Sequence, residues 1–195
     1  MAKLYFRYGA MNSGKTTALL QIAHNYEELG MKIVLIKPEI DKKGDSSVVS
    51  RLGIKREVDI LLGPLDKLTM NLNLDGISCI LVDEVQFLTP LQIKELWIIS
   101  KLNDIPVICY GLKTDFRGIL FEGSKALIEV ADELSELSTI CRCGNKARFN
   151  ARKINNEFVS DGEVVAIDGI DAYYESLCGK CYIEKVLKIT KNTNL

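Results

Sequence analysis

The chain has 195 residues, of which 47% are hydrophobic and 26% are charged. This length fits one sizeable domain, or a domain with a small appendage. Its 25 basic and 26 acidic residues nearly balance, which argues against nucleic acid as the main partner, because domains that bind a phosphate backbone usually show a clear basic excess. Neither a signal peptide nor a membrane-spanning run is apparent. We therefore expect a cytoplasmic protein with reduced thiols and no membrane partner.

Four apolar segments are predicted strands: residues 3–8, 32–38, 77–84 and 104–111. Between the first two, residues 16–30 carry apolar side chains at helical spacing, and Gly30 favours the end of that helix. A second helix is expected to follow Thr89, since Pro90 and Gln92 complete a Thr-x-x-Gln capping box. Residues 41–50 are polar and predict a loop. Strands this apolar indicate an α/β fold with a mainly parallel sheet that is covered on both faces.

The pattern changes near residue 139. From there cysteines occur in pairs, helical periodicity disappears, and Asn155-Asn156 and Asp161-Gly162 predict hairpin turns between short strands. We therefore predict two units, a nucleotide-binding domain at residues 1–138 and a smaller domain at residues 139–195.

A phosphate-binding loop is predicted at residues 9–17, GAMNSGKTT, which fits the pattern G-x-x-x-x-G-K-[ST] between a strand and a helix. Successive N–H groups of such a loop, with the positive end of the helix, bind phosphate oxygens. Gly9 and Gly14 let the backbone turn, Lys15 would reach the β- and γ-phosphates, and the Thr16 hydroxyl would bind Mg²⁺. A glycine loop that contains Lys-Thr by chance is the alternative, and the strand and helix around it argue against that.

Asp83 and Glu84 end a predicted buried strand, where a carboxylate is costly unless it faces a metal or a donor. In phosphate-loop enzymes such an aspartate helps to hold the Mg²⁺ of the nucleotide. Glu84 is then either a general base or a solvated carboxylate at a strand end. The element DEVQ also resembles that of nucleic-acid helicases, in which the glutamate polarises water. Those motors need a second domain of similar size, for which this chain has no room.

Two close cysteine pairs, Cys141-x-Cys143 and Cys178-x-x-Cys181, are about 35 residues apart, and such pairing is typical of tetrahedral zinc. Two disulfides are the alternative, which a reduced cytosol disfavours. We favour a zinc ion with a structural role, because four thiolate ligands leave no open position for a catalytic water. The remaining cysteines, at positions 79 and 109, lie in apolar runs and are expected to be buried. The single histidine, His24, is expected at the surface of the first helix.

In this order, the segments GAMNSGKTT, DEVQF, YGLKTDFRG (110–118), the cysteine pairs and IDGIDAYYE (167–175) resemble the thymidine kinases of the small zinc-containing family. The resemblance covers residues 3 to about 185. It implies transfer of a phosphoryl group from ATP to the 5′-hydroxyl of thymidine or deoxyuridine, for nucleotide salvage. It also implies a RecA-like phosphate-loop core, a lasso-like loop in the zinc domain and a homotetramer.

The same resemblance assigns roles to individual residues. It makes Glu84 the base that accepts the 5′-hydroxyl proton. The residues expected to bind ATP and Mg²⁺ are Gly9, Ala10, Met11, Asn12, Ser13, Gly14, Lys15, Thr16, Asp83 and Gln86. Those expected to bind the nucleoside are Met11, Phe87, Leu112, Phe116, Phe121, Val165, Ile167, Gly169 and Tyr174. The zinc ligands would be Cys141, Cys143, Cys178 and Cys181.

Two segments differ from the family pattern, and the spacing Cys141-x-Cys143 is shared by only part of the family. Asp41-Lys42-Lys43 stands where many members have Asp-x-Arg, and lysine supplies the charge without the bidentate fork of arginine. Asn150 stands where some members have a threonine beside the thymine methyl group. A zinc-containing ATPase stimulated by nucleic acid remains the alternative hypothesis, based on the DEVQ element and the basic residues at 146–153.

Overall fold

The protein is described here from a computed structural model, which covers residues 1–40, 46–68, 72–164 and 172–190. Its main sheet has six strands in the order β5-β2-β6-β7-β1-β8, and all of its pairings are parallel. These strands are β1 (Leu4–Tyr8), β2 (Lys32–Pro38), β5 (Ile60–Leu62), β6 (Ile77–Val82), β7 (Val107–Gly111) and β8 (Glu133–Glu136). The predicted α/β class with a mainly parallel sheet is thus confirmed.

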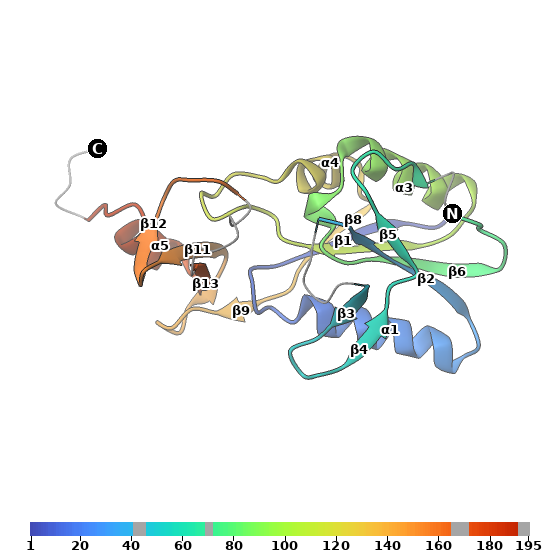
Figure 1. Ribbon diagram of the computed structural model, residues 1–195, viewed down its shortest axis with the longest axis horizontal. Coiled ribbons are helices and arrows are strands. Elements are labelled where there is room, and N and C mark those ends of the chain that lie inside the picture. The colour runs from blue at the N-terminus through green and yellow to red at the C-terminus, as the bar shows by residue number, and fades with distance from the viewer. Residues whose placement is uncertain (41–45, 69–71, 165–171, 191–195) are drawn as a thin grey trace.

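Helices cover both faces of the sheet, as Figure 1 shows. Helix α1 (Lys15–Glu28) packs on one face through side chains such as Leu19 and Ala23, whereas α3 (Pro90–Leu102) and α4 (Glu122–Val130) pack on the other. Because successive side chains of a strand point to opposite faces, β6 contributes Ile80 to the core under α3 and α4 and Leu81 to the core under α1. Two apolar cores therefore hold the sheet in place.

The capping box predicted at the second helix is present. The Thr89 hydroxyl accepts from the N–H of Gln92, and the Gln92 side chain accepts from the N–H of Thr89. Gln92 also donates to the carbonyl oxygens of Gly63 and Asp66, so this cap also fastens the segment after β5 to α3.

The polar segment predicted as a loop at 41–50 is only partly a loop. Residues 47–49 form β3 (Ser47–Val49), which pairs with β4 (Lys55–Glu57) as an antiparallel hairpin. Val48 is buried against α1, which explains why this part of the mostly polar segment is extended. Residues 41–45 lie outside the described part of the chain.

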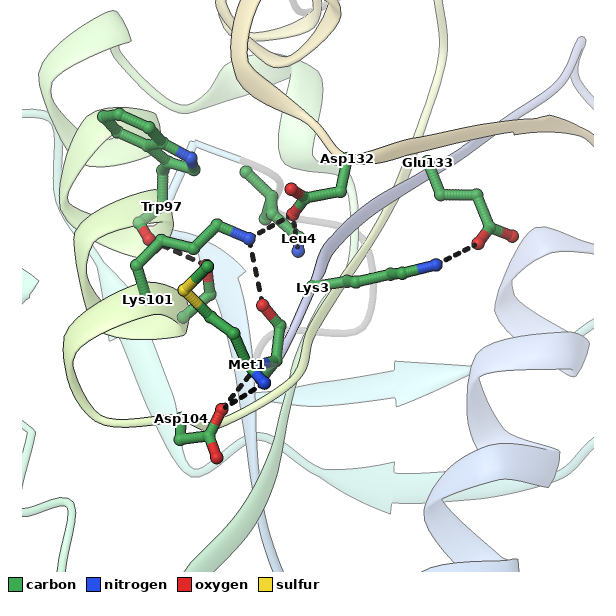
Figure 2. Close-up of polar contacts among 10 residues, drawn as sticks. Met1, Lys3, Leu4, Trp97, Lys101, Asp104, Asp132 and Glu133 are labelled. Carbon is green, nitrogen blue, oxygen red and sulfur yellow. Dashed lines mark hydrogen bonds and ion pairs between the residues drawn. The ribbon is translucent and has the colours of Figure 1, made fainter.

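The first residues of the chain are held by carboxylates from two other segments (Figure 2). Asp104 lies 2.5 Å from the N–H of Ala2, and Asp132 accepts from the N–H of Leu4 at 2.7 Å. Lys101 binds Asp132 and the carbonyl oxygen of Ala2. These contacts fix the start of β1, the strand that leads into the phosphate loop.

The described residues from 139 onward form a separate group of short elements at one end of the sheet (Figure 1). They are the hairpin of β9 (Thr139–Ile140) with β10 (Lys146–Ala147), a sheet in the order β12-β11-β13, and α5 (Gly179–Lys185). The strands of that sheet are β11 (Phe149–Ile154), β12 (Glu157–Val159) and β13 (Ala172–Leu177). Helix α5 is a correction to the expectation that helices are absent here.

The turn at Asn155-Asn156 joins β11 and β12 as predicted, and both residues have positive φ, as tight hairpin turns require. The prediction of a second hairpin at Asp161-Gly162 is wrong. After β12 the chain crosses to the far side of β11, where β13 pairs. Within the described ranges, no helix combines the length and apolar character that crossing a bilayer requires.

Candidate active site

The phosphate loop and the two acidic residues meet at the carboxyl ends of the parallel strands. The loop follows β1, while Asp83 and Glu84 follow β6 and lead into the 3₁₀ helix η1 (Val85–Phe87). Open α/β sheets bind ligands in the crevice at this edge. A cavity of about 990 Å³ lies there, lined by the loop, by Glu84 and by the first residues of α1.

The loop has the backbone geometry that its glycines require. Gly14 has φ +79°, a left-handed value that residues with a Cβ rarely adopt. A Cβ on Gly9 would lie 2.4 Å from Ser13 Oγ and 2.5 Å from the carbonyl oxygen of Leu137. Only glycine therefore fits at this position of the loop. The buried Ser13 Oγ has no hydrogen-bond partner within the described residues. A buried hydroxyl of this kind inside a cradle of N–H groups fits a phosphate ligand.

Lys15 lies over the loop, with its ammonium 3.2 Å from the carbonyl oxygen of Gly9 and 2.9 Å from that of Ala10. The Thr16 hydroxyl is 3.4 Å from a carboxylate oxygen of Asp83, which is only 4% exposed. A hydroxyl and a buried carboxylate that converge in this way supply the oxygen ligands that Mg²⁺ prefers. The residues present therefore fit a nucleotide with its magnesium ion.

Glu84 is held in an unusual conformation beside this site. Its φ of +49° lies in the left-handed region, which is uncommon for residues with a side chain and frequent at functional sites. Gln86 donates to the Glu84 carboxylate at 2.6 Å and accepts from the N–H of Leu112 at 3.0 Å. Gln86 is 2% exposed, so its amide fixes the orientation of Glu84 against the chain that follows β7.

Gly111 makes room for this arrangement. A Cβ at that position would lie 2.5 Å from Gln86 Oε1 and 2.9 Å from Cγ1 of Val85. Atoms cannot approach so closely, so a larger residue would displace Gln86 and with it Glu84.

Apolar side chains predicted to bind a nucleoside line the same cavity: Met11, Phe87, Leu112, Phe116, Phe121 and Tyr174. Two of them contact each other, with the rings of Phe87 and Phe121 edge to face and their centroids 5.7 Å apart. A mostly apolar wall with a few polar groups is the usual construction of small-molecule sites. Val165, Ile167 and Gly169 lie outside the described residues, as do Asp41, Lys42 and Lys43.

The four paired cysteines come together in the C-terminal unit. Their sulfur atoms lie within 4.8 Å of one another, and Cys143 Sγ is 3.5 Å from Cys178 Sγ. All six cysteines are free thiols. With Zn–S distances near 2.3 Å, sulfur atoms around a tetrahedral zinc ion lie roughly 3.8 Å apart, so the cluster fits that ion.

Hydrogen bonds within the cluster polarise its thiols. The backbone N–H of Asn145, followed by the neighbouring thiols, lowers the pKa of Cys143 to about 6. Hydrogen bonding to Cys143 raises the pKa of Cys181. One sulfur is thus stabilised as a thiolate, the form that binds metal. The buried thiol of Cys79, away from the cluster, has a pKa raised to about 11 by desolvation.

Other residues at the cavity were not predicted as site residues. Val49, Arg51 and Leu52 of the β3–β4 hairpin line it, and nothing in their sequence marked them. Asn150 also lines it, although the sequence indicated only that this position differs from the family pattern. Ser176 of β13 contacts the phosphate loop. Its place beside the loop follows from the pairing of β13 with β11, which the sequence does not indicate.

Comparison with known proteins identifies the family. A family model described as thymidine kinase matches residues 2–182. The chain belongs to the thymidine kinase family. Thymidine kinases of Chromobacterium violaceum and Pasteurella multocida are 45% and 46% identical to it. These alignments cover 93% and 95% of this chain and 98% and 99% of the relatives.

Membership of the thymidine kinase family makes the chain a kinase and therefore a transferase, which confirms the family predicted from the ordered motifs. A third relative, the thymidine kinase of Shewanella oneidensis, is 44% identical over 94% of this chain and 98% of its own. Among solved structures, the Pif1 helicase of Candida albicans aligns with a TM-score of 0.43 and 14% identity, covering 72% of this chain and 37% of that one.

Proposed function

We propose that this thymidine kinase transfers the γ-phosphoryl group of ATP to the 5′-hydroxyl of thymidine, and also of deoxyuridine, with Glu84 as general base. One observation carries the proposal: a single cavity joins the phosphate loop, Glu84 and six apolar residues suited to a nucleoside, and Asp83 lies 3.4 Å from the Thr16 hydroxyl at its wall. Phosphoryl transfer depends mainly on positioning and on stabilising charge, and this cavity offers groups for both.

In the proposed mechanism, the loop N–H groups and Lys15 bind the phosphates, while Thr16 and Asp83 hold Mg²⁺. When bound, that ion neutralises charge on the β- and γ-phosphate oxygens. Glu84 accepts the proton of the nucleoside hydroxyl as the oxygen attacks phosphorus. Gln86 keeps the carboxylate turned toward the cavity, since it donates to Glu84 at 2.6 Å.

The nucleoside would lie against the apolar wall, with Tyr174 beside its sugar. Phe87 and Phe121 narrow the cavity and help to keep water from competing for the phosphoryl group. Val165, Ile167 and Gly169 are proposed to bind the base through their main chain. One methyl group is worth only about 1–3 kcal/mol in an apolar pocket. Deoxyuridine should therefore also be phosphorylated, and the product would serve nucleotide salvage.

The four-cysteine cluster is proposed to hold a structural zinc ion. Four thiolates would fill a tetrahedral site, which leaves no position for substrate. The ion would tie Cys141 and Cys143, near the start of the C-terminal unit, to Cys178 and Cys181 after β13. The ion would thereby hold the two ends of the intervening segment together, as a loop that covers the nucleoside.

The remaining parts of the proposal concern organisation. We divide the chain into a nucleotide-binding domain at 1–138 and a zinc and nucleoside domain at 139–195, because β8 is the last strand of the main sheet in chain order and the described strands from β9 onward pair only with one another. We also propose a cytoplasmic homotetramer without nucleic-acid partners, following the family resemblance.

A coupled assay of ADP release separates this function from the alternative, an ATPase stimulated by nucleic acid. The purified protein is incubated with Mg-ATP and either thymidine or single-stranded DNA, and thymidine monophosphate is measured by chromatography. Release of ADP that depends on thymidine and matches the monophosphate supports the kinase. Hydrolysis stimulated by DNA, without a nucleoside product, would refute it.

A further inference from the structure

Two side chains of the C-terminal unit form hydrogen bonds with the main chain of one residue in the phosphate loop. Asn150 Oδ1 accepts from the N–H of Met11 at 2.7 Å, and the Ser176 hydroxyl donates to the carbonyl oxygen of Met11 at 2.6 Å. Both hydrogen-bonding groups of Met11 are thus used by residues that follow it by 139 and 165 positions. Contacts over such separations join the two units directly at the loop.

Asn150 and Ser176 act from one place in the smaller sheet. They are direct partners in the register of β11 and β13, and they are 4% and 8% exposed. Directly opposed residues of an antiparallel pair have Cβ atoms about 4.5–5.5 Å apart, which suits side chains that hold the two ends of one residue. Because both are buried, removing either leaves a main-chain group of Met11 without its partner.

The Asn150 amide has a further contact that fixes its orientation. Its Nδ2 donates to the carbonyl oxygen of Thr114 at 3.4 Å, in the segment that follows β7. Met11 needs an acceptor and Thr114 needs a donor, and a side-chain amide supplies both. Asn150 therefore links the phosphate loop, the segment after β7 and the C-terminal unit.

The position of Met11 explains why this link would affect catalysis. Its N–H points to Asn150 and not into the phosphate cradle, while its side chain lines the cavity beside the residues expected to hold the nucleoside. Fixing this peptide therefore sets the loop that holds the phosphates and one wall of the acceptor site at the same time. A displacement of about 1 Å in such an arrangement can cost about a hundredfold in rate.

We infer that Asn150 and Ser176 are positioning residues, which hold Met11 so that the acceptor hydroxyl meets the γ-phosphate in line. This inference rests on the proposed function. Through this pair the cysteine-anchored unit controls the geometry of the phosphate loop, so that the two units form one active site.

The kinetic test compares Asn150→Ala, Ser176→Ala and the double variant with the wild type. Each single change should lower kcat about tenfold or more at saturating substrates. The double variant should lose little more than either single one, because both side chains hold the same residue. Tyr173→Phe is the matched control. Tyr173 also lies on β13, but at the surface, where its hydroxyl donates to the side chain of Asn156. Removing that hydrogen bond should leave kcat unchanged.

A second readout does not depend on activity. Hydrogen exchange of the Met11 amide, measured without substrates, should be faster in Asn150→Ala than in the wild type or in Tyr173→Phe. Asn150→Asp should retain this protection, because a carboxylate still accepts from Met11 although it cannot donate to Thr114. This experiment stands even if the wild type fails to phosphorylate thymidine, so the two proposals can fail separately.

Two results would overturn the inference. One is an unchanged kcat and an unchanged Met11 exchange in both single variants, which would leave the pair a purely structural role. The other is a raised KM for the nucleoside in Asn150→Ala, with kcat and Met11 exchange unchanged, which would make Asn150 a substrate contact.

Discussion

Replacing Gln86 with leucine tests whether the orientation of Glu84 determines the rate. The change removes a hydrogen bond of 2.6 Å to the Glu84 carboxylate and leaves the N–H of Leu112 without its acceptor. A hydrogen bond to a charged group contributes about 1.5–3 kcal/mol, and each 1.4 kcal/mol changes a rate about tenfold. We therefore expect kcat to fall roughly 10- to 100-fold, with the dissociation constant of ATP changed much less.

Gln92→Leu is the matched control for this experiment. Gln92 is also a buried glutamine, 2% exposed, with hydrogen bonds to Gly63 and Asp66, but it lies in the helix cap and outside the cavity. Its loss should lower the melting temperature and leave kcat nearly unchanged well below that temperature. Initial rates at saturating ATP and thymidine, with calorimetric ATP titrations, measure both effects. A Gln86→Leu enzyme that keeps the wild-type kcat would refute the role given to this amide.

Three further predictions concern packing, charge and metal. Gly111→Ala should lower kcat as much as Gln86→Leu, because its Cβ would lie 2.5 Å from Gln86 Oε1; a wild-type rate would show that the site can relax. The hydrogen bond that Asp132 accepts from Lys101 is the chief cause that lowers the pKa of this carboxyl. The stabilisation that Asp132 gives to the folded state is therefore complete above the unfolded pKa of about 4 and is lost as the pH falls through the lower folded pKa. In urea denaturation, Asp132→Asn should therefore lower the free energy of unfolding by about 1 kcal/mol at pH 7 and by less in acid; an equal loss at both would contradict this. Elemental analysis should find about one zinc ion per wild-type chain and much less in Cys178→Ser, while Cys79→Ala should retain it; an equal content in both variants would argue against the cluster.

Sequence patterns predicted those parts of the fold that depend on local chemistry. The strand at 32–38 contains a continuous apolar run that predicts a strand without a solvent-exposed face, and β2 has those bounds. The cap at Thr89 was readable because its donors and acceptors lie within four residues of one another. The phosphate loop was likewise complete in one short stretch, and the structure brings it to the same cavity as Glu84.

Features that depend on distant contacts could not be predicted in this way. Helix α4 begins at Glu122 after Phe121, which offers no side-chain cap, so no start signal marks it. The strands β3 and β4 have only three residues each, and β3 is held in place because Val48 packs on α1. The pairing of Asn150 with Ser176 depends on a chain crossing that neither strand encodes alone. Tertiary packing decides such cases, as it often does for short and polar elements.

Glu84 is proposed to remove the proton from a nucleoside hydroxyl. The measurement that tests it most directly is single-turnover phosphorylation of thymidine by Glu84→Gln, with ATP binding measured on the same preparation. We expect thymidine monophosphate to form at least about a hundredfold more slowly while the affinity for ATP is retained, because Asp83, Thr16 and the phosphate loop are unchanged. Phosphoryl transfer at the wild-type rate would contradict it.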